Sequence, residues 1–141
     1  MNIRIFYDEI KFRMKGWKKI AEIIKVIIEK ENRKTGKINF IITSDKRLKE
    51  LNVKFLKRNY YTDVITFNYS EKDIIDGEIY ISFDTVKRNA INYKVSLKSE
   101  MLRVAFHGVF HLCGYDDKTD KEKVTMKKME DLWIGIFNSY K

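Results

Sequence analysis

The chain contains no proline, only one cysteine and only two histidines among its 141 residues. A single cysteine, Cys113, cannot form an internal disulfide, which excludes the disulfide-rich secreted class and agrees with a reducing compartment. We expect Cys113 to be a small packed residue. No segment approaches the roughly 20 apolar residues that span a bilayer, and acidic residues follow the start of the chain too closely for a secretory signal. We therefore expect a cytoplasmic protein with no membrane partner, folded as one domain over residues 1–141.

Positive charge is concentrated in the first part of the chain. Residues 1–58 contain 17 Lys and Arg against 7 Asp and Glu, a net charge of +10 compared with +9 for the whole chain. Such an asymmetry favours a partner with a phosphate backbone, because basic side chains that contact phosphates displace counterions. The alternative is that these lysines cover the solvated faces of helices in a lysine-rich protein.

The two histidines stand four residues apart and are followed by a glycine and an acid. On a helix, His107 and His111 lie on one face and can reach the same ion. Gly114 can end the helix in a left-handed conformation and bring Asp117 back to that ion. Three such ligands leave a fourth position open for water. A zinc protease with this ligand spacing carries a general-base Glu where this chain has Gly108, so the pattern predicts metal-assisted hydrolysis without that base.

Several carboxylates are candidates for supporting roles near this metal site. Glu100 lies on the same helix face about two turns before the ion, and two interpretations remain open for it. It orients His107 from behind the metal ligand, or it is a solvated acid near the start of the helix. Asp63, Glu78 and Asp116 are possible general bases, and the sequence assigns the role to none of them.

The segment from His107 to Asp117, HGVFHLCGYDD, resembles the HGxLHLxGYDH signature of the YbeY family, bacterial metal-dependent endoribonucleases of rRNA maturation. Upstream, Leu51-Asn52 together with residues 62–67 is similar to the family's LN...PTDVLSF segment. Residues 77–82 are similar to its G-D-I-x-I strand. The chain departs from the signature at Asp117, which stands where the family usually has a third histidine and offers an oxygen ligand that zinc also accepts.

The resemblance also implies a set of RNA-binding residues. The family usually has an arginine, expected to contact RNA, where this chain has Leu56, and Lys57 and Arg58 follow at once. Together with Lys54, these two residues are the predicted RNA-binding residues, expected to line the same groove as the ion.

The predicted function is therefore hydrolysis of single-stranded RNA in small-subunit rRNA maturation and ribosome biogenesis. One Zn²⁺, or another divalent ion, held by His107, His111 and Asp117 would activate the attacking water. Two alternatives remain open. A zinc-dependent peptidase uses the same ligand spacing, and a non-catalytic ribosome-associated module would bind RNA and use the metal only for structure.

Hydrophobic periodicity predicts an α+β fold with a small mixed sheet of about four strands, about five helices and the metal site on a central helix. Strands are expected at residues 2–7, 38–42, 62–68 and 78–83, and helices at residues 17–31, 45–54, 84–93, 97–113 and 119–140. Gly36 is interpreted as a breaker after the first helix, and residues 70–77 as a polar loop. Thr119 and Glu122 predict a capping box for the last helix, whose core-facing stripe is expected to contain Met126, Met129, Trp133, Ile136 and Phe137.

Overall fold

The computed structural model of the chain describes residues 2–57 and 62–140. In chain order, its elements are β1 (Ile3–Tyr7), α1 (Trp17–Lys30), β2 (Lys34–Thr43), α2 (Asp45–Leu56), β3 (Val64–Asn68), β4 (Ile74–Ser82), α3 (Phe83–Tyr93), α4 (Leu97–Leu112) and α5 (Asp120–Ser139). The order and type of these elements agree with the prediction, and the α+β class is confirmed.

The four strands form one mixed sheet in the order β1-β2-β4-β3. β1 and β4 both run parallel to β2, and β3 pairs antiparallel with β4 at the edge. The parallel strands are rich in isoleucine because their inner positions are covered by helices. Ile38, Phe40 and Ile79, for example, have no exposed surface.

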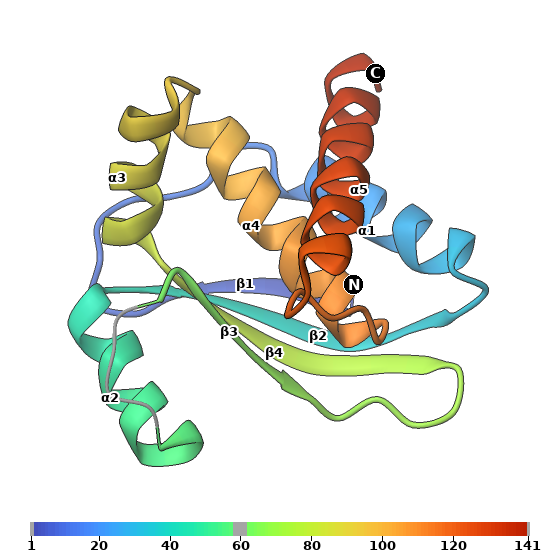
Figure 1. Ribbon diagram of the computed structural model, residues 1–141, viewed down its shortest axis with the longest axis horizontal. Helices are drawn as coiled ribbons and strands as arrows, with labels where there is room; N and C mark the ends of the chain where they lie inside the picture. Colours follow the sequence, from blue (N-terminus) through green and yellow to red (C-terminus); the bar gives the residue numbers. More distant parts are fainter. Residues whose placement is uncertain (1, 58–61, 141) are drawn as a thin grey trace.

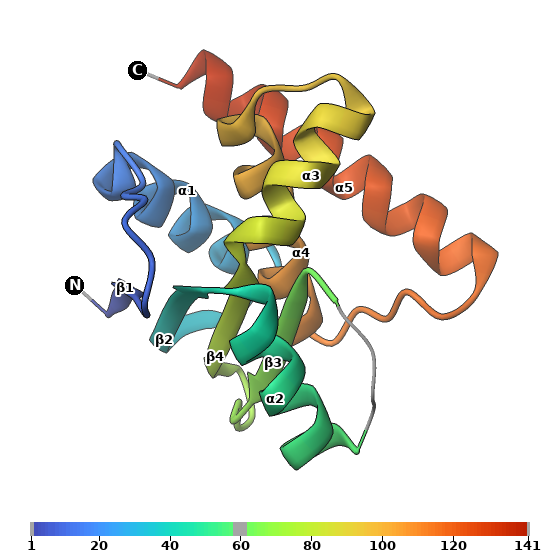
Figure 2. The ribbon, with the colours of Figure 1, turned by 90° about the vertical axis from the view of Figure 1, so that its left-hand side faces the viewer.

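The helices are divided unequally between the two faces of the sheet. α1, α3, α4 and α5 lie on one side, and α2 lies on the other, near β3 (Figures 1 and 2). α4 occupies the centre of the helical layer, and it is buried along nearly its whole length. A central buried helix of this kind is a rigid support for side chains at its C-terminal end.

Two local predictions were wrong, for reasons that involve the neighbouring strand. Gly36 does not follow a helix end, because α1 stops at Lys30 and Gly36 lies inside β2, where the pairing with β4 shifts register. A Cβ at Gly36 would collide with the Asp76 side chain, which accepts a hydrogen bond from the Lys37 backbone N–H at 2.6 Å. The predicted loop 70–77 is also too long, since Ile74 already begins β4.

The predicted helix caps are present. The Ser44 hydroxyl accepts a hydrogen bond from the Arg47 backbone N–H, and Thr119 and Glu122 form the expected capping box. On α5, Met126 and Phe137 are buried, and the other three residues of the predicted stripe are partly buried against the core. Among the described residues, no helix is both long and apolar enough to pass through a lipid bilayer.

Candidate metal centre

The last turns of α4 present two imidazoles on one side of the helix. α4 begins after Ser96, whose hydroxyl accepts a hydrogen bond from the Ser99 backbone N–H at 3.0 Å. His107 and His111 are only partly buried, with 21% and 22% of their side-chain surface exposed. Because they stand four residues apart, the rings lie one turn from each other, with 4.5 Å between their centroids.

A Schellman motif ends α4 and turns the chain back toward the histidines. Gly114 has a φ of 102°, as the prediction of a left-handed glycine required. Its N–H donates to the His111 carbonyl, and the Tyr115 N–H donates to the Phe110 carbonyl, both at 3.0 Å. The Tyr115 and Phe110 rings also pack together, the apolar contact that accompanies this motif. The turn places the Asp117 carboxylate beside both imidazoles.

Hydrogen-bond acceptors fix the tautomers of both rings. His111 Nδ1 lies 2.9 Å from the Tyr115 carbonyl oxygen, which has no hydrogen to donate, so Nδ1 carries the hydrogen. His107 Nδ1 lies 2.7 Å from Glu130 Oε2. The other Glu130 oxygen accepts a hydrogen bond from Arg103 at 2.9 Å, so this carboxylate takes the acceptor role and His107 Nδ1 donates to it. In the neutral rings, both Nε2 atoms therefore keep their lone pairs.

Three electron-pair donor atoms converge at this point. The two Nε2 atoms are 2.9 Å apart, and Asp117 Oδ2 is 3.2 Å from that of His107 and 3.5 Å from that of His111. Ligands bound about 2.0–2.1 Å from a tetrahedral zinc ion lie about 3.3 Å from one another. The three separations thus match one face of such a tetrahedron. Lone pairs this close repel unless a cation lies among them, so the residues present fit a divalent metal ion.

A proton can take the place of that cation. Burial lowers the pKa of His107, but the hydrogen bond and negative charge of Glu130, with the charge of Asp117, outweigh this effect and raise the pKa above its ordinary value. A metal ligand must be a neutral imidazole, so protons and metal compete for the same Nε2 atom.

Glu130 is the carboxylate that holds His107, and the sequence did not identify it. It comes from α5, is 6% exposed, and is held in turn by Arg103, which also binds Asp131. The prediction that Glu100 orients His107 is wrong, because Glu130 already occupies His107 Nδ1. Glu100 is not a solvated acid near the start of the helix either, because it is buried and only 3% exposed.

We expect Glu130→Gln to weaken metal binding by about 10- to 100-fold. The two carboxylate oxygens of Glu130 accept from Arg103 and His107 separately, whereas glutamine offers one oxygen for both. Competition with a chromogenic chelator measures the affinity for zinc. Asp131→Asn is the matched control, because it removes the same charge from the same helix without touching His107. Equal affinities for the two variants would contradict this role.

Glu100 makes the stability of the metal-free protein depend on pH. Burial raises the pKa of its carboxyl to about 7, although Arg103 lowers it, compared with an ordinary value of 4.5 in the unfolded chain. Between these values the folded protein binds more protons than the unfolded chain, so stability is lost as pH rises through this range. Glu100→Gln cannot titrate. We therefore expect its free energy of unfolding, relative to that of the unsubstituted protein, to rise by up to about 3 kcal/mol from pH 5 to pH 8. Urea unfolding at both pH values measures this, and parallel pH profiles would refute it.

Of the three possible general bases, only two lie at the metal centre. Asp63 and Asp116 line a cavity of about 420 Å³ in front of the imidazoles. Glu78 does not line it. Its neighbours Gly77 and Ile79 face α4, so the Glu78 side chain lies on the other face of the sheet, where it accepts a hydrogen bond from Tyr69. Cys113 is buried in the core, as predicted, and burial raises its pKa to about 11.

Two of the predicted RNA-binding residues, Lys54 and Lys57, belong to the same end of α2 as Leu56, which lines the 420 Å³ cavity that we call the α2–β3 pocket. Its lining residues are Asn52, Leu56, Thr62, Asp63, Val64, Ile65, Thr66, His107, His111, Asp116, Asp117 and Lys118. Lys54 and Lys57 are exposed at the end of α2 beside Leu56, without lining the pocket themselves. Arg58 lies outside the described residues. Among the described residues, Lys118 is the lysine that lines this pocket, and the concentration of charge in residues 1–58 gave no signal for it.

The chain is similar over nearly its whole length to one family of proteins. The family model described as Endoribonuclease YbeY matches residues 3–138. Endoribonuclease YbeY of Karelsulcia muelleri is 40% identical over 129 residues, which cover 92% of each protein. The same-named protein of Flavobacterium psychrophilum is 39% identical over 133 residues, covering 94% of this chain and 95% of that protein.

A solved structure agrees with these sequence matches. The solution structure of TM1509 from Thermotoga maritima has a TM-score of 0.66 with this chain at 32% identity, and the match covers 96% of this chain and 88% of that one. Because both the family model and these relatives match almost the entire chain, the chain belongs to the endoribonuclease YbeY family.

Proposed function

We propose that the chain is a metal-dependent endoribonuclease that hydrolyses single-stranded RNA during maturation of small-subunit rRNA. Residues 1–141 would act as one catalytic domain, with one zinc ion held by His107, His111 and Asp117. The observation that carries this proposal is the convergence of three metal-ligand atoms at the edge of an open, polar pocket. Its relatives carry the name endoribonuclease, which supports RNA as the substrate.

Each neighbouring residue then has a chemical role. A bound divalent ion would lower the pKa of water toward about 7 and polarise a phosphoryl oxygen. Glu130 and the Tyr115 carbonyl orient the imidazoles. Lys118 lies where it can neutralise charge on the substrate phosphate. Burial raises the pKa of Asp63 above its ordinary value, which suits this carboxylate to accept a proton at neutral pH.

The packing of α4 argues against a peptidase. A Cβ at Gly108 would lie 2.8 Å from Ile79 Cγ2 of β4, so the position faces the sheet and cannot hold the Glu that a protease of this ligand spacing uses. A purely structural zinc site is normally closed by four protein ligands. The cluster in the described part of the chain has three.

An assay with one preparation separates the three functions. Protein stripped with a chelator is reloaded with zinc, manganese or nickel and offered single-stranded RNA, duplex RNA and casein. We expect cleavage of single-stranded RNA only after reloading. Cleavage of casein without cleavage of RNA would establish the peptidase. RNA binding that survives chelation, with no cleavage of RNA even after reloading, would establish the binding module.

We expect Lys54 and Lys57 to bind the strand on the α2 side of the ion. Each phosphate contact on a single strand contributes about 0.7 to the slope of log affinity against log salt, so the Lys54→Ala, Lys57→Ala double variant should lower that slope by up to about 1.4. Fluorescence anisotropy with labelled RNA measures it. Lys18→Ala with Lys25→Ala, two exposed lysines of α1, is the control. If both pairs change the slope equally, Lys54 and Lys57 do not line the groove that holds the ion.

A further inference from the structure

A second pocket lies on the other side of the imidazoles, between the α3–α4 turn and the first half of α5. We call it the α5 pocket; it has a volume of about 700 Å³. It shares His107 and Asp117 with the α2–β3 pocket, so the ligand cluster lies where the two pockets meet. A linear polymer that runs across the cluster can therefore contact the protein on both sides of it.

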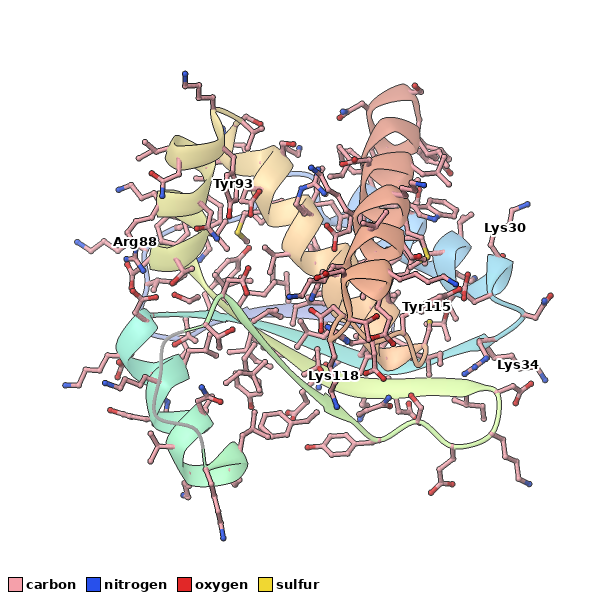
Figure 3. The ribbon with its side chains drawn as sticks, in the orientation of Figure 1. Lys30, Lys34, Arg88, Tyr93, Tyr115 and Lys118 are labelled. Atoms are coloured by element: carbon pink, nitrogen blue, oxygen red, sulfur yellow. The ribbon has the colours of Figure 1, made fainter. Side chains whose placement is uncertain are left out.

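The α5 pocket has an apolar part formed by Tyr93, Val95 and Met126. Tyr93 ends α3 and lies near the upper end of α4, whereas Lys118 lies near its lower end (Figure 3). The Tyr93 side chain is 63% exposed and that of Val95 is 42% exposed. An exposed aromatic ring at the edge of a pocket offers a stacking surface for a nucleic acid base, whichever base it is.

The pocket also has a basic part, formed by Lys123 and Lys127 one turn apart on α5. Like charges at this spacing repel each other and disfavour the helix. Within residues 2–57 and 62–140, neither ammonium group has an ion-pair partner. The Glu130 carboxylate in the same pocket already binds Arg103 and His107. The two lysines are therefore placed to bind an anion.

We propose that the α5 pocket binds the nucleotide next to the cleaved phosphate of single-stranded RNA, with its base stacked on Tyr93 and its phosphates bound by Lys123 and Lys127. The pairing of an apolar stacking surface with two cations matches the two parts of a nucleotide, and the volume lies within the range of about 300–1,000 Å³ typical of ligand pockets. This inference rests on the proposed function, because it takes RNA as the substrate.

The test measures, by fluorescence anisotropy, the binding of a short fluorescein-labelled single-stranded RNA to the chelator-treated 141-residue chain. Tyr93→Ala should weaken binding by about fivefold or more, the effect of losing one stacked base, whereas Tyr93→Phe should keep the affinity. Ile91→Ala is the control, since this residue is exposed on α3 and does not line the pocket.

The lysines are tested with a matched pair on the same helix. Lys123→Ala with Lys127→Ala should lower the salt slope by up to about 1.4. Lys121→Ala with Lys128→Ala removes the same charge from exposed positions outside the pocket and should change the slope far less. Equal effects of the two pairs, or an unchanged affinity of Tyr93→Ala, would overturn the inference.

The same proteins distinguish this inference from the proposed function. If the expected contrasts in binding appear but the metal-loaded protein does not cleave the RNA, the pocket assignment stands and the endoribonuclease proposal fails. If the metal-loaded protein cleaves but the contrasts are absent, the pocket assignment alone is wrong. A protein that does not bind RNA at all overturns both.

Discussion

His111→Ala is expected to reduce RNA cleavage by more than about 100-fold, while RNA affinity stays within a few-fold of the unsubstituted protein. Loss of a residue that only orients a metal ligand costs about 10- to 100-fold, so loss of the ligand itself should cost more. RNA affinity depends mainly on basic side chains, and these remain. Cleavage of labelled RNA and anisotropy with the chelated proteins measure the two quantities.

This comparison requires that His111→Ala is folded. The His111 side chain is partly exposed and lies outside the buried core, so circular dichroism should show unchanged helix content and a cooperative melt. Asp120→Asn, an exposed substitution at the start of α5, is a control for activity lost during preparation. If folded His111→Ala cleaves at the original rate, cleavage does not depend on an ion held by His111, and the proposed metal-dependent mechanism is wrong.

Two glycine-to-alanine substitutions in helices should change stability in opposite directions. At Gly108 the new Cβ would lie 2.8 Å from Ile79 Cγ2 and 3.1 Å from its Cδ1, so we expect a loss of about 1–3 kcal/mol from overpacking. Gly135 lies on α5 with nothing within 4 Å of a new Cβ, so alanine there should add about 0.5–1 kcal/mol through helix propensity. Urea unfolding measures both.

The larger substitution Gly108→Glu, which recreates the protease pattern, should prevent folding altogether. It would place a carboxylate against the buried isoleucine of β4, which adds the cost of an unpaired buried charge to the overpacking. A folded Gly108→Glu protein, or a Gly108→Ala protein as stable as the original, would show that α4 is not packed against β4 at this residue.

The three candidate metal ligands could be predicted from the sequence because they lie within eleven residues of one another. Helical spacing places His107 and His111 on one face, and a glycine turn brings Asp117 back, so local geometry determines the cluster. Glu130 could not be predicted in this way. It lies 23 residues beyond His107 and reaches the ring only because α5 packs against α4.

Contacts between elements that are far apart in the sequence also explain the wrong predictions for Glu100 and Gly36. Glu100 does share a helix face with the histidines, but the sequence does not show that Glu130 fills the space behind His107. Gly36 looks like a helix breaker along the chain, and its role as an irregular position in β2 depends on Asp76 across the strand pair. The excess charge before residue 58 likewise gave no indication that Lys123 and Lys127 line a pocket at the metal centre.

Asp117 and the two pocket lysines belong to one continuous stretch of chain, since the loop after α4 leads directly into the turns of α5 that carry Lys123 and Lys127. An ion that fixes Asp117 against α4 also restricts where these ammonium groups can lie. Affinity for metal and affinity for RNA are then thermodynamically coupled, and such coupling is reciprocal. In the presence of competing chelators, the metal-loaded protein would therefore retain the ion most firmly while RNA is bound.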